Sequence, residues 1–213
     1  MAAAGYRTIR TGAEALGEVE DRRSRFIASL VHVGSEAEAQ AHLEAVRVLH
    51  HDARHNVPAW VLADGRERCS DDGEPSRTAG MPALEVLRGA GLADVSVVVT
   101  RSFGGTLLGP GGLVRAYTAA VQAAVAAAAE EGLICEMTLV TPVTVQLPYS
   151  AYDRIVRMAS DANGKVRDSV FAEDVQLTLA FKSGDEAAFI DAIIEFAQGE
   201  ELARAEEPRF QEF

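Results

Sequence analysis

Five glycines fall within residues 104–112, whose sequence is GGTLLGPGG. The segment follows a β-branched run and precedes a long helical pattern, so it is expected at a helix N-terminus. Free backbone N–H groups and the helix dipole can hold an anion there, and glycine lets the backbone approach a ligand closely. Arg101 stands just before the segment and Arg115 about one turn into the expected helix. The pattern predicts a phosphate or carboxylate pocket, although glycines that serve only tight turns and close packing would look the same. The glycines of this predicted pocket are Gly104, Gly105, Gly109, Gly111 and Gly112.

This spacing of glycines excludes two common nucleotide-binding classes. It is neither the G-x-G-x-x-G pattern of dinucleotide-binding folds nor the G-x-x-x-x-G-K-S/T pattern of P-loop NTPases. We predict no cofactor.

An acidic loop offers a second set of reactive groups. Asp71, Asp72 and Glu74 place three carboxylates within four residues. Such a set could hold Mg²⁺, serve as a general base or bind a basic group. A solvated acidic turn is the alternative, because Asp, Gly and Pro are common in turns. The loop ends at a second expected helix N-terminus, where Thr78 and Gly80 could add to the anion site.

The segment HDARH at residues 51–55 imitates a zinc-protease motif without its context. A zinc protease needs both histidines on one helix face, whereas this segment joins a helix to a strand. His55 shares a strand face with Val57 and Val61, so we expect it to be partly buried. It is either a satisfied core histidine or a proton shuttle, and Arg54 beside it is a candidate anion ligand. The cysteines, Cys69 and Cys135, have no metal-type spacing and fit a reducing cytosol.

The charge of the chain argues against broad binding to a phosphate backbone. The net charge is -12; residues 1–133 contribute -4 and residues 134–213 contribute -8. All 13 basic residues of the first part are arginine, which suits bidentate contact with phosphate or carboxylate. The net charge therefore does not exclude a local basic pocket. No apolar run approaches the ~20 residues that span a bilayer, and no signal peptide is recognisable. We therefore expect a cytoplasmic protein with no membrane association and no DNA binding.

The pattern of elements predicts a mixed α/β chain of two domains, 1–135 and 136–213. In the first, we expect strands at 25–33, 54–62 and 94–101, and helices from Ser35 to about Leu49, from between Thr78 and Pro82 to near 89–91, and from the glycine-rich segment to about Glu130. Pro58 within the second strand indicates an edge or a bulge. In the third helix, an apolar stripe at four-residue spacing is expected to be buried; it consists of Leu113, Tyr117, Val121 and Val125. In the second domain, strands at 139–147, 165–171, 174–181 and 202–206 and helices at 149–161 and 185–198 give the ferredoxin-like order βαββαβ.

Three blocks of the first domain resemble the YigZ/IMPACT family. They are HDARHN at 51–56, SDDGEP at 70–75 with TAGMP at 78–82, and RSFGG at 101–105 with LGPGGLVRAY at 108–117. The resemblance covers about residues 24–125, and the second domain is similar to the family's bacterial C-terminal module, which is likened to an elongation-factor domain. It implies a fold like domain 2 of ribosomal protein S5 and, from eukaryotic relatives, a link to translational control. Arg77, Ser102 and Val57 depart from the family's usual Gly, aromatic and Cys.

Three functions compete at this point. The first is a non-enzymatic, translation-linked protein that binds RNA or the ribosome, with Trp60 and Phe103 as candidate stacking residues. The second is a Mg²⁺-assisted enzyme acting on a small phosphorylated or acidic substrate, with Arg101 and Arg115 holding the anion and His55 moving protons. The third is a protein-interaction module that uses the acidic second domain. We rank them in this order.

Overall fold

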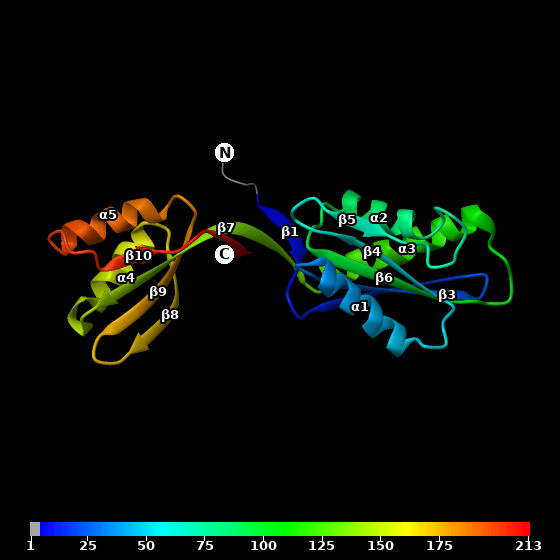
Figure 1. The fold of residues 1–213 in the computed structure, drawn as a ribbon, viewed down its shortest axis with the longest axis horizontal. Coiled ribbons are helices and arrows are strands. Elements are labelled where there is room, and N and C mark those ends of the chain that lie inside the picture. The colour runs from blue at the N-terminus through cyan, green and yellow to red at the C-terminus, as the bar shows by residue number, and fades with distance from the viewer. Residues whose placement is uncertain (1–4) are drawn as a thin grey trace. The chain divides into compact units, whose positions relative to one another are not determined.

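The computed structural model describes residues 5–213, which form two compact units. The N-terminal unit spans residues 6–135, and the C-terminal unit comprises residues 136–213 together with Gly5 (Figure 1). Both units mix helices with antiparallel sheet, so the predicted fold class is confirmed.

The N-terminal unit is built on a five-stranded antiparallel sheet in the order β2-β3-β6-β4-β5. Strand β6 lies at its centre and is buried at every position except the last, as its continuous β-branched sequence predicts. Along the chain, the elements are β1 (Tyr6–Ile9), β2 (Glu14–Asp21), β3 (Ser24–His32), α1 (Glu36–Leu49), β4 (His55–Val61), β5 (Glu67–Cys69), α2 (Gly80–Gly89), β6 (Val95–Ser102) and α3 (Gly109–Glu130).

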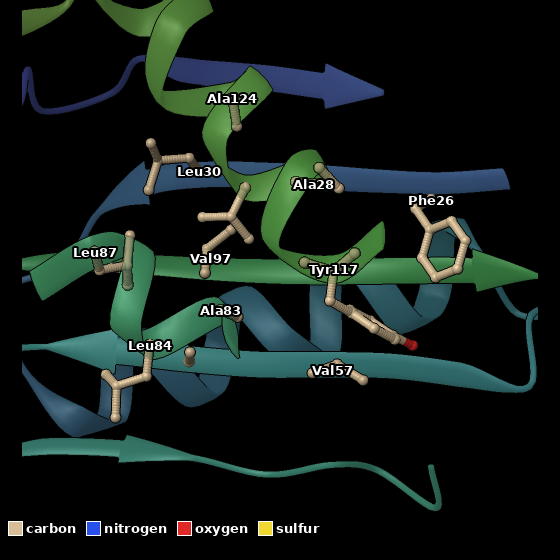
Figure 2. Packing of buried hydrophobic residues seen from close by; sticks show 14 of the residues in the cluster. Phe26, Ala28, Leu30, Val57, Ala83, Leu84, Leu87, Val97, Tyr117 and Ala124 are labelled. Carbon is tan, nitrogen blue, oxygen red and sulfur yellow. The ribbon is translucent and has the colours of Figure 1, made fainter. Parts of the chain in front are cut away.

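Helices cover both faces of this sheet (Figure 1). Helices α2 and α3 pack on one face, where the main core forms around Phe26, Leu87 and Tyr117 (Figure 2). Helix α1 packs on the other face through Leu43 and Val46. Because the sheet is enclosed on both sides, polar side chains that point from it into either layer must find partners inside the protein.

Helix α3 lies unusually close to the sheet, which accounts for its alanine-rich sequence. A Cβ on Gly17 of β2 would lie 2.2 Å from the backbone nitrogen of Ala124 and 2.4 Å from the carbonyl oxygen of Ala120. Glycine on the strand and alanine on the helix are therefore both needed for this approach. The helix has the length and hydropathy of a membrane span, but Leu113, Tyr117 and Val121 of its predicted stripe are buried in the core, and Val125 is partly buried.

One local prediction is confirmed in atomic detail. The hydroxyl of Ser35 accepts a hydrogen bond from the Glu38 N–H and caps α1, while the Glu38 carboxylate accepts one from the Gly34 N–H.

The prediction that Pro58 marks an edge strand or a bulge is wrong. Strand β4 lies between β6 and β5, and its register with β6 is unbroken. Pro58 lies beside the end of β5, where its carbonyl accepts a hydrogen bond from Ser70. Its ring nitrogen faces the same side, so the missing N–H leaves the ladder to β6 intact.

The structure also differs from the sequence prediction in the N-terminal unit. Strands β1, β2 and β5 were not predicted, and β5 forms just before the acidic loop. Helix α3 begins at Gly109 rather than after the glycine-rich segment, with Pro110 in its first turn. Proline suits this place because the N–H that it lacks would have no helical partner.

The C-terminal unit has the predicted ferredoxin-like topology. Its strands follow the antiparallel order β10-β7-β9-β8, with α4 and α5 on one face of the sheet. A further strand, β11, was not predicted and pairs with the first half of β7. The elements are β7 (Ile134–Leu147), a short 3-10 turn (Tyr149–Ala151), α4 (Tyr152–Asp161), β8 (Lys165–Phe171), β9 (Val175–Lys182), α5 (Glu186–Phe196), β10 (Ala203–Ala205) and β11 (Arg209–Glu212).

Candidate functional site

A cleft of about 900 Å³ opens at the end of the N-terminal sheet where β6 finishes and β4 begins. Four chain segments that are distant in sequence meet there. They are the start of β4, the acidic loop, the end of β6 and the glycine-rich segment. The lining residues are Asp52, Ala53, Arg54, His55, Glu74, Pro75, Arg101, Ser102, Phe103, Leu107, Leu108, Gly109, Pro110 and Leu113.

A buried ion pair forms part of the wall of the cleft. The Nη1 group of Arg101 donates to both carboxylate oxygens of Glu74, at 2.7 and 2.9 Å, and the two side chains are 8% and 3% exposed. The hydroxyl of Tyr117 donates to the same carboxylate at 2.9 Å. Burial and the neighbouring Glu74 charge raise the pKa of Tyr117, so its hydroxyl stays a donor. The carboxylate therefore holds the guanidinium in one position.

Arg101 keeps hydrogen-bonding capacity that the protein does not use. Its Nε is buried and has no hydrogen-bond partner within the described chain. The guanidinium carbon lies 5.6 Å from the centre of the Phe26 ring and 5.7 Å from that of Phe103. Two aromatic rings and one carboxylate thus stabilise a cation beside the cleft. A guanidinium held in this way is preorganised to receive an acceptor group from a ligand.

His55 lies at the mouth of the same cleft and is only half-buried. Its Nδ1 lies 2.8 Å from the carbonyl oxygen of Asp72. Because a carbonyl can only accept, Nδ1 carries the proton in this contact, and Nε2 of the neutral ring is an acceptor. The exposed side chain of Arg54 precedes it, so the cleft offers a cation and an imidazole at one edge.

Part of the cleft lining is apolar. Phe103 is 58% exposed and Leu107 79% exposed, although both are large hydrophobic residues. Leu108 and Leu113 line the cleft with them. A ligand with an anionic part and a flat apolar part would match both the charged and the apolar lining residues.

The three carboxylates of the acidic loop do not share one site. Asp71 accepts hydrogen bonds from the backbone N–H groups of Arg77, Ala79 and Gly80 and so caps α2. Burial raises the pKa of Asp71, but these hydrogen bonds outweigh that effect and hold the pKa below its usual value. Asp72 pairs with Arg47 at 3.0 Å and accepts from the Asn56 N–H.

Glu74 therefore faces the cleft without the other two carboxylates. Within residues 5–213, no group of three His, Cys, Asp or Glu side chains is placed to hold a metal ion. The candidate metal set of Asp71, Asp72 and Glu74 is thus dispersed over three separate contacts.

The glycine-rich segment contributes less to the cleft than its sequence suggests. Of its glycines, Gly109 lines the cleft, and its φ of +72° explains the residue type. Gly104 serves close packing, because a Cβ there would lie 2.0 Å from the backbone of Arg23. Gly112 likewise packs closely, against Leu108, while Gly105 has a positive φ and Gly111 is exposed.

Three other predicted anion ligands lie outside the cleft lining. Arg115 is exposed, and its Nη1 lies near Gly111. The Thr78 hydroxyl donates to the Pro75 carbonyl, and the Gly80 N–H to Asp71. The structure thus brings Arg54, His55, Glu74, Arg101 and Gly109 together and leaves the remaining candidates elsewhere.

Sequence reasoning missed the role of Tyr117. It was predicted only as a member of the apolar stripe of α3, yet its hydroxyl completes the Glu74–Arg101 pair. One signal was available, because a tyrosine in the middle of a buried stripe must find a hydrogen-bond partner for its hydroxyl.

Known proteins resemble this chain in sequence and in structure. The model of the Impact N-terminal domain matches residues 22–125, which include the whole cleft, and a domain of unknown function matches residues 145–200. IMPACT family member YigZ of Escherichia coli is 36% identical, over 84% of this chain and 88% of its own. IMPACT family member YvyE of Bacillus subtilis is 33% identical, over 91% of this chain and 88% of its own. A crystal structure of a hypothetical protein aligns with a TM-score of 0.64 at 32% identity, covering 97% of this chain and 98% of that one.

Proposed function

Since the chain belongs to the IMPACT family, we propose that it is a translation-linked, non-enzymatic binding protein whose cleft receives a segment of single-stranded RNA. The observation that carries the proposal is that the exposed Arg54 and the exposed aromatic side chain of Phe103 line one cleft. Single-stranded RNA is bound by this combination, because bases stack on aromatic rings while arginines contact phosphates. A role in translation implies action in the cytoplasm.

Each wall of the cleft has a part in this proposal. Phe103 offers a ring that is 58% exposed, on which a base can stack. Arg54 is exposed and contacts phosphate, while Arg101 lines the cleft with a guanidinium that Glu74 holds in place. Trp60 is 8% exposed and lies in the core beneath α1, so it has no part in stacking.

Two further arginines extend the basic surface beside the glycine-rich segment. Arg22 and Arg23 form the exposed turn between β2 and β3. The Nη1 group of Arg22 donates to the Leu107 carbonyl at 3.3 Å, and Gly104 packs on the Arg23 backbone. The arginines around the cleft thus supply a local basic area on a chain whose net charge is -12. We expect a small number of phosphate contacts and therefore a shallow dependence of affinity on salt.

The magnesium-assisted enzyme is not proposed, because its carboxylates have separate structural roles. Asp71 caps a helix, Asp72 holds Arg47 and the β4 backbone, and Glu74 neutralises Arg101. His55 and Asp52 also line the cleft, but the three carboxylates that were to hold the magnesium ion do not meet there.

Filter binding of labelled ribosomal RNA, transfer RNA and oligouridylate, at salt concentrations from about 50 to 200 mM, tests the proposal. We expect Phe103→Ala to weaken oligouridylate binding roughly tenfold or more, since it removes a stacking surface. Arg54→Ala should lower the slope of log affinity against log salt by about 0.7, the value for one phosphate contact on a single strand.

Arg66→Ala is the matched control for these variants. Arg66 is exposed and lies beyond the other end of β4, where it pairs with Asp64. Its removal should leave RNA affinity unchanged. The proposal fails if the wild-type chain binds none of the three RNAs at the lowest salt, or if the two cleft variants bind like Arg66→Ala.

A further inference from the structure

Three basic side chains of the C-terminal unit gather around one aromatic ring. Lys165 Nζ lies 4.4 Å from the centre of the Phe213 ring, Lys182 Nζ lies 5.6 Å from it and the guanidinium carbon of Arg167 lies 6.0 Å from it. Cation–π attraction to the ring holds the three positive charges near one another despite their mutual repulsion. We call these four residues the Phe213 cluster.

The register of the C-terminal sheet places the two lysines on the face opposite α4 and α5. Alternate residues of β9, including Leu179 and Phe181, belong to the core beneath α4 and α5. Lys182 has the opposite parity and is exposed, and Lys165 pairs with Ala180, which shares that parity. The cluster therefore lies on the sheet face that the helices leave uncovered.

The Phe213 cluster is positively charged, whereas the C-terminal unit around it is acidic overall. Residues 134–213 carry 15 acidic and seven basic residues, yet three of the seven meet at this ring. In the described part of the chain, none of the three cations forms an ion pair. Arg167 donates instead to the Glu212 carbonyl at 2.9 Å. A register shift between Val166 and Asp168 puts Asp168 on the same face as Lys165, and its carboxylate accepts a hydrogen bond from the Ser169 N–H.

From this geometry we infer that the Phe213 cluster is a second RNA contact, which binds backbone phosphates of a single strand on the sheet face opposite α4 and α5. An anion there would offset the mutual repulsion of the three cations. An antiparallel sheet face that carries cations and aromatic rings is a recurrent surface for single-stranded RNA. The inference takes RNA as the ligand from the proposed function, but its residues are independent of the cleft.

Fluorescence anisotropy of labelled oligouridylate with the full-length chain tests this contact. Lys165→Gln and Lys182→Gln should each lower the slope of log affinity against log salt by about 0.7. Arg157→Gln is the matched control, because Arg157 is an exposed cation on α4, which covers the opposite face of the sheet. It should bind with the wild-type slope.

The possible outcomes separate this inference from the proposed function. Lysine variants that keep the wild-type slope, together with a weakened Arg54→Ala variant, overturn the second contact and leave the cleft proposal standing. Reduced slopes in the lysine variants with an unaffected Arg54→Ala variant support the second contact and count against the cleft. A wild-type chain that binds no oligouridylate overturns both.

Discussion

The two faces of the N-terminal sheet each bury a polar cluster, and the clusters differ in how fully their groups are paired. Beneath α1, His42 contacts Ser29 through Nε2 at 2.8 Å and Ser96 through Nδ1 at 2.9 Å. Both ring nitrogens of His42 therefore have partners. The Ser29 hydroxyl in turn donates to the Glu14 carboxylate at 2.6 Å. On the other face, Glu74, Tyr117 and Arg101 are connected, but Arg101 Nε has no hydrogen-bond partner among residues 5–213.

This difference separates a structural network from one that is prepared for a ligand. The His42 network satisfies its own groups, and none of its members lines the cleft. The Arg101 network contains a full charge pair and borders the cleft with donor capacity to spare. An unpaired buried donor is costly unless a ligand or water uses it. Mutations in the two clusters should therefore affect stability on both faces but RNA binding on one.

The largest effect is expected from Glu74→Ala. The substitution leaves the Arg101 charge buried without its carboxylate, which costs about 3–5 kcal/mol of unfolding free energy. Urea denaturation measures the loss. The double variant Glu74→Leu with Arg101→Met should recover most of it, because it removes both charges together. A single variant as stable as the wild type would mean that solvent in the cleft already hydrates Arg101, and the contrast between the faces would disappear.

The next effect is a pH dependence that belongs to the α1 face. Burial lowers the pKa of His42 from 6.5 to about 4. Between pH 6.5 and pH 4, His42 is protonated in the unfolded chain but not in the folded chain. The unfolding free energy therefore decreases as the pH falls from about 6.5 to about 4. The loss should reach about 3 kcal/mol, and it should be complete below the lower value.

Chemical denaturation of the wild type and of His42→Gln over this pH range measures that effect. The difference in unfolding free energy between the two should shrink with decreasing pH, while RNA affinity at neutral pH should be equal. A constant difference would show that His42 is solvated, and a loss of RNA binding would show that the two faces are coupled.

Tyr117→Phe should have a smaller effect, of about 2 kcal/mol. It removes one hydrogen bond to a charged group and leaves the Arg101 pair in place. Thermal or urea unfolding gives the stability change. If Tyr117 also fixes the orientation of the ion pair, oligouridylate affinity should fall in parallel. Unchanged stability would indicate that the hydroxyl adds nothing to the paired carboxylate.

Local sequence patterns predicted most elements because those elements carry their own signals. Ser35 caps α1, unbroken β-branched residues form β6, and the apolar stripe of α3 is visible in its spacing. Strand β5 has three residues in a polar loop, and it exists because β4 offers an unpaired edge to it. Strand β2 has the small residues Ala15 and Gly17 at its buried positions, and its close packing depends on α3, about a hundred residues away in sequence. Such pairings are decided by tertiary contacts that a local window does not contain.

The site was predictable to the level of segments but not of side chains. Sequence motifs indicated that the acidic loop, the β6 end and the glycine-rich segment carry the candidate residues. They could not identify which carboxylate meets Arg101, because that depends on the turn. Asp72 has a φ of +45° and Gly73 a φ of +85°, so the chain reverses between Asp71 and Glu74 and sends their side chains to different partners. A left-handed aspartate is uncommon, and nothing in its neighbours marks it in advance.

The smallest stability effect is expected at the rim of the cleft, from Arg54→Ala. Arg54 is exposed and forms no ion pair among residues 5–213, so unfolding free energy should change by less than about 0.5 kcal/mol. Its effect on oligouridylate binding should nevertheless exceed that of His42→Gln, which acts on the other face of the same sheet. Urea titrations and anisotropy measurements on both variants test whether Arg54→Ala has the smaller effect on stability and the larger effect on affinity. An Arg54→Ala variant with unchanged affinity would remove the rim from the binding surface, and the spare donor of Arg101 would then have to account for anion recognition in the cleft.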